Sequence, residues 1–360
     1  YSEDEITTTI LYNYFIKFIH QLNSNLQYNI YTKNGDFVEF YCMKLNSFAE
    51  CVTLNFPNPN VLLDKFYKEK DKQERLKNRS INLQRLLHTN IDRCLKKSEK
   101  LDAMLAKCKT KEDYKIKGDL LTSFIYSINP NDSEITLYNF YSEDYEDITI
   151  NLDPNKSPAE NVQSYYKKYN KLKKSEESAI EQLEKNSDEL EYLNSVLTNI
   201  ENCESYTEID DIKEELISTG YVRKRKANGK NNKKAKPSKP LHYISSDGID
   251  IFVGKNNIQN DNLSLKFANK NHMWLHTKNI PGSHVIVCSN DVPDNTLVEA
   301  ATLAAYYSKA KESSKVDVDY TLVKNLKKPN GAKPGMVIYH TNYTMTVDPS
   351  DIKSLNLEKK

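Results

Sequence analysis

The sequence has few hydrophobic residues and no long hydrophobic run. Hydrophobic types make up 38% of its 360 residues and charged types 28%. That apolar share is low for one compact globule and is typical of long solvated helices joined to small cores. No apolar run approaches the roughly 18 residues of a membrane-spanning helix, and no signal peptide begins the chain. We therefore expect two or three domains and no membrane segment.

Paired cysteines are also missing. The six cysteines are scattered, with no C-x-x-C and no paired spacing, which in a chain of this length indicates reduced thiols and a cytoplasmic protein. The chain begins at Tyr1 rather than at a methionine, so we expect a fragment or a chain whose N-terminal part is processed. The net charge of +1, from 51 basic and 50 acidic residues, gives no overall field, although local segregation of charge would still attract nucleic acid.

Motifs for nucleotide, metal and covalent chemistry are absent as well. The sequence contains neither G-x-x-x-x-G-K-[ST] nor G-x-G-x-x-G after a strand. His272 and His276 are four residues apart on an expected strand, hence roughly 13 Å from each other, whereas zinc requires nitrogens at about 2.0–2.1 Å from one ion. Ser283 and His284 point to opposite faces of a strand and cannot act together as nucleophile and base. We therefore expect no enzyme, no cofactor and no metal site.

The first 60 residues have mixed helical and strand patterns. Helical spacing over residues 2–22 predicts a helix. Strand-like runs at 28–32 and 37–43 are joined across Asn34-Gly35, a strong hairpin signal, and a third run follows at 51–55. Three strands and one helix rarely close a core alone, so residues 1–60 are interpreted as the end of a larger domain together with the helix before it.

Two helical stretches, 61–110 and 155–203, have the period of a coiled coil. In the second, apolar residues alternate in steps of three and four, and only Glu176 and Asn186 interrupt them. This pattern predicts a left-handed antiparallel coiled coil in which the two polar residues fix the register. Residues 111–154 break the pattern and predict a small α/β tip. The seam could form within one chain or between two chains, and a coiled coil by itself indicates a spacer.

A strongly basic linker follows a short helix at 204–221. Residues 222–240 hold nine Lys or Arg and no acid. This composition predicts a flexible linker and also suits an arm that neutralises phosphates, and the two interpretations are compatible. Six of its residues are the candidate nucleic-acid contacts of this segment: Arg223, Lys224, Arg225, Lys226, Lys233 and Lys234.

Residues 241–350 predict a compact α+β domain, followed by a tail at 351–360. Asp261 is placed to cap a short helix through Ala268. Amides and lysines bond phosphate oxygens, and aromatic or imidazole rings stack on bases. We rather expect Trp274 at a strand centre to belong to the core, so its polar neighbours support the RNA hypothesis. The candidate contacts of this domain are Lys255, Asn256, Asn257, Gln259, Asn260, Lys266, Trp274, His276, Lys278 and His284.

Several short motifs resemble those of the NFACT family, whose bacterial RqcH members are also called fibronectin-binding protein A and are relatives of eukaryotic NEMF. In the C-terminal domain these are DG at 247–248, VGKN at 253–256, QND at 259–261, WLH at 274–276, PGSHV at 281–285, AYYSK at 305–309 and KPG at 333–335. Upstream they are KDK at 70–72, LDP at 152–154 with SP at 157–158, and residues 165–174. The resemblance covers essentially the whole chain, and it implies that residues 241–350 form the NFACT-R domain and residues 1–60 the end of the NFACT-N lobe.

The resemblance also implies a function. Proteins of this kind bind the large ribosomal subunit (50S) when it holds a stalled peptidyl-tRNA. They recruit alanyl-tRNA for mRNA-independent alanine tailing, in which the ribosome forms the peptide bond. Ribosomal RNA and tRNA are then the expected partners, and this fragment would bind subunits without supporting tailing. Two alternatives remain open: a fibronectin-binding surface adhesin, which the lack of a signal peptide, anchor and disulfides disfavours, and a coiled-coil scaffold without direct RNA contact.

Overall fold

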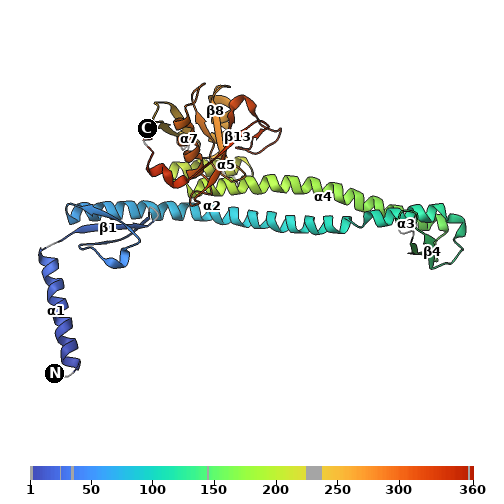
Figure 1. Ribbon diagram of the computed structural model, residues 1–360, viewed down its shortest axis with the longest axis horizontal. Helices are drawn as coiled ribbons and strands as arrows, with labels where there is room; N and C mark the ends of the chain where they lie inside the picture. Colours follow the sequence, from blue (N-terminus) through green and yellow to red (C-terminus); the bar gives the residue numbers. More distant parts are fainter. Residues whose placement is uncertain (1–2, 25, 34–35, 144–145, 224–236, 356) are drawn as a thin grey trace, which may run out of the picture. The chain divides into compact units, whose positions relative to one another are not determined.

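The computed structural model describes residues 3–24, 26–33, 36–143, 146–223, 237–355 and 357–360 (Figure 1). It divides into two compact units: Tyr1–Leu83 with Cys203–Asp210, and Gln84–Asn202 with Asp211–Lys360. Both units combine helices with antiparallel sheets, in agreement with the predicted α+β class. Among the described residues, no helix is both long and apolar enough to cross a bilayer.

The first unit contains the three predicted strands. β1 (Tyr28–Lys33) lies in the centre and pairs with β2 (Asp36–Tyr41) on one side and β3 (Val52–Phe56) on the other. Ile30 of β1 is fully buried and belongs to the same small core as Phe66, which lies near the start of the long helix that follows. The small sheet therefore gains its core by packing on that helix.

The rest of this unit is helical. α1 (Glu3–Ser24) matches the helix predicted at 2–22, and the short 3₁₀ turn η1 (Asn46–Phe48) precedes β3. The Asn34-Gly35 pair, predicted to form the hairpin turn, lies outside the described residues.

Two long helices, α2 (Pro59–Cys108) and α4 (Pro158–Glu201), form the predicted antiparallel coiled coil, which we call the stalk. Its buried seam residues are seven apart on each helix, which is the heptad repeat of a coiled coil. They are Leu87, Cys94, Leu101 and Cys108 on α2, and Ala179, Asn186, Leu193 and Ile200 on α4. A capping box of Ser157 and Glu160 starts α4.

Both polar seam residues have partners on another helix. Asn186 Nδ2 donates to the carbonyl oxygen of Cys94 at 2.8 Å and to Ser98 Oγ at 2.7 Å. Glu176 forms an ion pair with Lys111. The seam therefore forms within one chain, and a buried amide bonded across it favours one register over its neighbours.

The tip lies between the two stalk helices. It consists of α3 (Lys111–Ser123), the 3₁₀ turn η2 (Ile125–Ser127) and a hairpin of β4 (Glu134–Tyr138) and β5 (Asp147–Asn151). The tip thus has the predicted α/β composition, with its helix followed by a 3₁₀ turn. Leu120, Leu121 and Ile150 of the tip share a small core with Val162 at the start of α4.

A short helix, α5 (Tyr206–Ser218), follows the stalk. Gly220, two residues after the end of α5, has a φ of 85°, which is the left-handed conformation of a C′ glycine. The amide of Tyr221 donates to the carbonyl of Leu216 at 2.9 Å, as expected of this type of helix end.

The C-terminal domain is built on a seven-stranded antiparallel sheet in the order β13-β10-β8-β9-β7-β6-β14. Its last strand, β14 (Glu358–Lys359), pairs with β6 (Leu241–Ile244), so residues near the end of the chain, expected to be a tail, complete the sheet. The other strands of the sheet are β7 (Asp250–Val253), β8 (Met273–Thr277), β9 (Val285–Val287), β10 (Val316–Leu322) and β13 (Tyr343–Val347). A separate ribbon pairs β11 (Leu326–Lys327) with β12 (Ile338–Tyr339).

Different elements cover the two faces of this sheet. On one face, α7 (Asp294–Tyr306) and η5 (Pro349–Lys353) enclose the larger core. On the other, Trp274 packs in a smaller core with residues of η3 (Leu263–Phe267), η4 (Val323–Asn325) and the β11–β12 ribbon. Trp274 is 1% exposed, so its expected place in the core is confirmed.

Candidate nucleic-acid interface

The predicted amide cluster begins α6 (Asn257–Asn262). Asn256, rather than Asp261, caps this helix, because its side chain accepts a hydrogen bond from the amide of Gln259 at 2.9 Å. Gln259 Oε1 in turn accepts one from the amide of Lys255 at 3.1 Å, and its Nε2 donates to the carbonyl of Ser238 at 2.9 Å. These bonds hold the VGKN loop to the helix that follows it.

Asn257 joins the domain to the helices before it. Its Nδ2 donates to Ser195 Oγ of α4 at 2.9 Å and to Glu215 Oε1 of α5 at 3.1 Å, and its amide donates to Glu215 Oε2 at 3.2 Å. Glu215 is fully buried and also accepts a hydrogen bond from the Tyr192 hydroxyl at 2.9 Å. Burial raises the pKa of the Glu215 carboxyl, while these hydrogen bonds act in the opposite direction.

The position of the Asn260 side chain explains why the VGKN motif has a glycine, Gly254. Asn260 Oδ1 accepts a hydrogen bond from the amide of His284 at 3.1 Å. A Cβ on Gly254 would lie 2.1 Å from that oxygen, so no other residue fits there without movement. The VGKN motif thus requires its glycine for packing rather than for contact with a ligand.

The four amide side chains are therefore structural in this conformation. Asn256, Asn257, Gln259 and Asn260 are between 1% and 8% exposed, and their amide groups bond protein atoms. Buried polar groups are normally satisfied within the protein, and these would have to break such bonds to reach RNA. In this conformation they shape the surface, and their direct contact with RNA stays a prediction.

Aromatic and imidazole rings form a second cluster next to this network. The ring of His276 lies nearly parallel to that of Trp274, at 14° and 5.8 Å between centroids, and the His284 ring meets Trp274 edge to face at 5.2 Å. Tyr339 packs on Trp274 at 5.0 Å. Trp274 and His284 are buried, whereas His276 is partly exposed. Of the three predicted ring contacts, only His276 can therefore reach a ligand at the surface.

Burial also determines the pKa values of the two imidazoles, those of His276 and His284. It lowers the pKa of His284 well below its ordinary value, with a smaller contribution from the charge of His276. The Ser264 hydroxyl lies 2.7 Å from His284 Nδ1. Burial lowers the pKa of His276 too. Both rings are therefore neutral at neutral pH and carry no charge toward phosphate. Within the described residues, no group of three or more His, Cys, Asp or Glu is arranged to hold a metal ion.

The predicted basic contacts divide into two groups. Arg223, Lys266 and Lys278 are exposed, and Lys255 is partly buried. Five others lie in the segment outside the described residues: Lys224, Arg225, Lys226, Lys233 and Lys234.

A lysine patch that our sequence reasoning missed lies on the Trp274 side of the domain. Residues 262–290 and 320–347 contain no acidic residue, and backbone hydrogen bonds of 3.0 Å join Val323 to His272 and Lys324 to Lys270. Exposed lysines gather where these two stretches meet. They are Lys266, Lys270, Lys324 and Lys327, which we call the lysine patch. Phe267 beside them is 52% exposed, and the absence of acids was the signal in the sequence.

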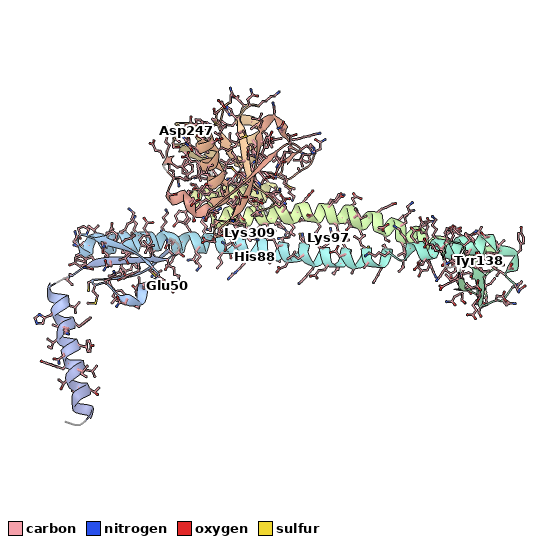
Figure 2. All side chains as sticks on the ribbon, viewed as in Figure 1. Glu50, His88, Lys97, Tyr138, Asp247 and Lys309 are labelled. Atoms are coloured by element: carbon pink, nitrogen blue, oxygen red, sulfur yellow. The ribbon has the colours of Figure 1, made fainter. Side chains whose placement is uncertain are left out.

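Acidic side chains mark the start of α7, on the other face of the sheet. Asp247 accepts a hydrogen bond from Thr296 of α7 at 2.7 Å, and Glu299 of α7 accepts one from the amide of Ser246 at 3.0 Å. Figure 2 labels Asp247 in this domain. These hydrogen bonds tie the turn before β7 to the start of α7.

The tip carries the opposite charge from the lysine patch. From Gly118 to Asn155 the sequence has no Lys, Arg or His and eight acids. Several aromatic rings are exposed on it, including Tyr126 at 100% and Tyr138 at 45%. Figure 2 labels Tyr138 on the tip. The acids are Asp119, Asp132, Glu134, Glu143, Asp144, Glu146, Asp147 and Asp153. Such a surface repels phosphate and attracts a basic partner.

Comparison with known proteins places these features in a family. Residues 2–235 match the family described as NFACT N-terminal and middle domains, and residues 239–341 match the NFACT protein RNA binding domain. The chain belongs to the NFACT family. The lysine patch therefore lies in the segment that matches the NFACT RNA-binding domain.

Individual NFACT relatives agree. A protein named "Rqc2 homolog RqcH" from Bacillus subtilis (strain 168) is 38% identical over 333 residues, which is 92% of this chain and 58% of the relative. One of the same name from Streptococcus suis (strain 05ZYH33) is 38% identical over 307 residues, 84% of this chain and 54% of the relative. The chain thus spans somewhat more than half the length of these NFACT proteins.

A solved structure shares the fold. The C-terminal part of the fibronectin/fibrinogen-binding protein of Streptococcus suis matches with a TM-score of 0.62 and 35% identity, over 78% of this chain and 99% of that one. The stalk-and-domain architecture is therefore shared with another protein that resembles this NFACT chain in sequence.

Proposed function

We propose that this chain is the RNA-contacting part of a ribosome quality-control factor. The factor would bind the large ribosomal subunit that holds a stalled peptidyl-tRNA and recruit alanyl-tRNA for mRNA-independent alanine tailing. In this role it is a binding factor, and the ribosome forms the peptide bond. The single observation that carries the proposal is the lysine patch on a domain of the NFACT RNA-binding type. Identity of 38% to the two RqcH proteins supports the ribosomal setting.

Physical chemistry supports RNA as the partner of the lysine patch. Four exposed lysines lie on stretches without acids, so their charges are not cancelled by neighbours along the chain. Exposed Phe267 lies beside Lys266 and offers a ring on which an unpaired base can stack. The nine basic residues of segment 222–240 would add phosphate contacts wherever that segment meets RNA. The combination of cations and an aromatic ring is typical of proteins that bind single-stranded RNA.

The salt dependence of binding tests the proposal. If the four lysines each neutralise one phosphate, affinity for RNA falls roughly 50- to 150-fold between 50 and 200 mM salt, because counterions released on binding oppose it at higher salt. The measurement is fluorescence anisotropy of labelled ribosomal RNA segments with the 360-residue chain, repeated by co-sedimentation with 50S subunits.

A double substitution locates the contact. Lys270→Ala with Lys324→Ala should weaken RNA binding by roughly tenfold at low salt and flatten the salt dependence by about two counterions. The matched control is Lys311→Ala with Lys315→Ala, two exposed lysines outside the patch. Equal losses in both pairs would show that the patch is not the contact. Full retention of ribosome affinity in the patch variant would favour a coiled-coil scaffold.

Fibronectin binding is a second candidate, because the solved relative from Streptococcus suis is titled a fibronectin/fibrinogen-binding protein. The same chain immobilised against fibronectin separates the two functions. Nanomolar binding that does not change with salt would favour adhesion, since counterion release governs contact with nucleic acid but not a protein interface of mixed polarity.

A further inference from the structure

A small cleft lies where the C-terminal domain meets α4. It has a volume of about 30 Å³, and its walls come from α4, α6, the Pro281-Gly282 turn and the loop around Gly335, with His276 among them. None of these residues lies in the lysine patch. The cleft is therefore a separate feature of the same domain.

Packing fixes the backbone walls of the cleft. A Cβ on Gly282 would lie 2.8 Å from Thr277 Oγ1, and one on Gly335 would lie 2.5 Å from Asn257 Oδ1. Asn257 is itself held by Ser195, as described above. Two glycines that bring the backbone close to neighbouring side chains and a hydrogen-bonded amide thus define these walls, and ligand sites are usually formed in this way before a ligand binds.

Its size and shape restrict the ligand. A volume of about 30 Å³ accommodates about two water molecules, so the cleft admits the edge of a flat ring rather than a bulky group. His276 lines it and lies nearly parallel to Trp274. An imidazole backed by an indole is a platform on which a further planar ring can stack.

The polar groups of the cleft determine which hydrogen-bonding groups a ligand must present on the edge that enters it. The amide of Asn257 is committed to protein partners, and Ser195 both accepts from it and donates to the carbonyl of Tyr192 at 2.8 Å. In the part of the chain that the structure describes, the exposed carboxylate of Glu191 has no hydrogen-bond or ion-pair partner. A carboxylate only accepts hydrogen bonds. The complementary ligand therefore presents N–H donors.

We propose that this cleft binds the edge of one unpaired nucleobase of the RNA held on the lysine patch, with guanine preferred. The N1–H and the 2-amino group of guanine would both donate to Glu191, while the ring stacks on His276. Lys270 of the patch precedes β8 and His276 of the cleft lies near its end, so the two are at most about 20 Å apart at 3.3 Å per residue, and one short RNA segment reaches both. This assignment rests on the proposed RNA-binding function.

The test compares short single-stranded RNAs that differ in one central base, bound to the whole 360-residue chain. Guanosine should bind about tenfold more tightly than uridine, and inosine, which lacks the 2-amino group, should fall between them. Trp274 is the only tryptophan in the chain, so its fluorescence should change on binding the guanosine RNA more than on binding the uridine RNA.

Glu191→Gln removes the charged acceptor while keeping the shape of the side chain. It should reduce the guanosine preference to less than about threefold and leave the affinity for the uridine RNA unchanged, since a neutral acceptor forms weaker hydrogen bonds. The matched control is Glu184→Gln, one heptad earlier on α4, exposed and outside the cleft. The control should retain the full guanosine preference.

The outcomes separate the two proposals. RNA binding without a base preference, or a preference that survives Glu191→Gln, overturns the cleft assignment and leaves RNA binding intact. Failure of every RNA to bind overturns the proposed function and the cleft assignment together. Equal loss of preference in Glu184→Gln would show a general charge effect and would also overturn the cleft assignment.

Discussion

The tip and the lysine patch belong to one chain and have opposite charge. The tip has eight acids and no base over residues 118–155, whereas residues 262–290 and 320–347 have lysines and no acid. Both expose aromatic rings, Tyr126 on the tip and Phe267 beside the patch. A net charge of +1 conceals this difference. The comparison teaches that local segregation of charge, and not the total, decides which class of partner each surface attracts.

The C-terminal domain, which carries the lysine patch, and the tip should differ most in the stability that each loses when a glycine is replaced by alanine. Gly254→Ala should destabilise the C-terminal domain by about 2–4 kcal/mol, because the new Cβ displaces Asn260 and breaks its bond to the amide of His284. Thermal unfolding followed by Trp274 fluorescence measures this, since the chain has one tryptophan.

Gly118→Ala is the matched change in the tip. Its Cβ would lie 3.2 Å from ring carbons of Tyr166, a close approach that a small shift of the ring relieves. Alanine also favours a helix interior over glycine by about 0.5–1 kcal/mol. We therefore expect a net change within about 1 kcal/mol, measured by hydrogen exchange of the tip amides. A larger loss in Gly118→Ala than in Gly254→Ala would contradict the packing described for Asn260.

Lowering the pH should destabilise the C-terminal domain at a higher pH than it destabilises the tip. The folded-state pKa of His284 lies well below the ordinary value of 6.5, and that of His276 is lowered too. Between these folded values and about 6.5 the unfolded chain binds protons that the folded domain does not. Domain stability should therefore be full above about pH 6.5 and fall as the pH is lowered through that value.

Residues 118–155 contain no histidine, so the tip should show no such loss in the same window. The measurement is the melting temperature of the domain by Trp274 fluorescence from pH 7.5 down to pH 5, with hydrogen exchange of the tip as the reference. A domain whose melting temperature stays constant across this range would mean that the two imidazoles are not buried in their neutral form.

The smallest expected effect comes from reversing charge on the tip. Glu143→Lys with Glu146→Lys changes two exposed acids and should raise affinity for free RNA by no more than about threefold, because charges far beyond the Debye length of about 10 Å are screened. Affinity for 50S subunits should fall if the tip meets a basic protein surface there. Anisotropy with RNA and co-sedimentation with subunits measure the two effects. A large gain in both would show that the tip itself contacts RNA.

Local patterns explain which features the sequence could predict. The stalk was predictable because its seam residues repeat every seven positions, and Asn186 stood out as a polar residue in that repeat. The internal hydrogen bonds of Asn257 could not be predicted, because its partners, Ser195 and Glu215, lie 62 and 42 residues away in the sequence. Burial produced by such distant contacts leaves no local pattern. The pairing of β14 with β6 is of the same kind.

The lysine patch was missed for a different reason. Candidate residues were chosen by type near Trp274, so Lys266 was included while Lys270, Lys324 and Lys327 were not. The backbone bond between Lys324 and Lys270 joins two segments more than 50 residues apart. The lack of acids in both segments was nevertheless visible in the sequence, and it would have pointed to the whole patch.

Because the Asn186 side chain fixes the register of the stalk, the stalk can be lengthened only by equal insertions in both of its helices. Adding seven residues to α2 and seven to α4, both beyond the Cys94–Asn186 contact, would move the tip about 10 Å farther from it at 1.5 Å per residue. Every seam residue would keep its neighbour across the stalk. An insertion in one helix alone would slide the heptads past each other. The length of the stalk in such proteins can therefore change by whole heptads, one in each helix, while the surfaces at either end of the stalk stay unchanged.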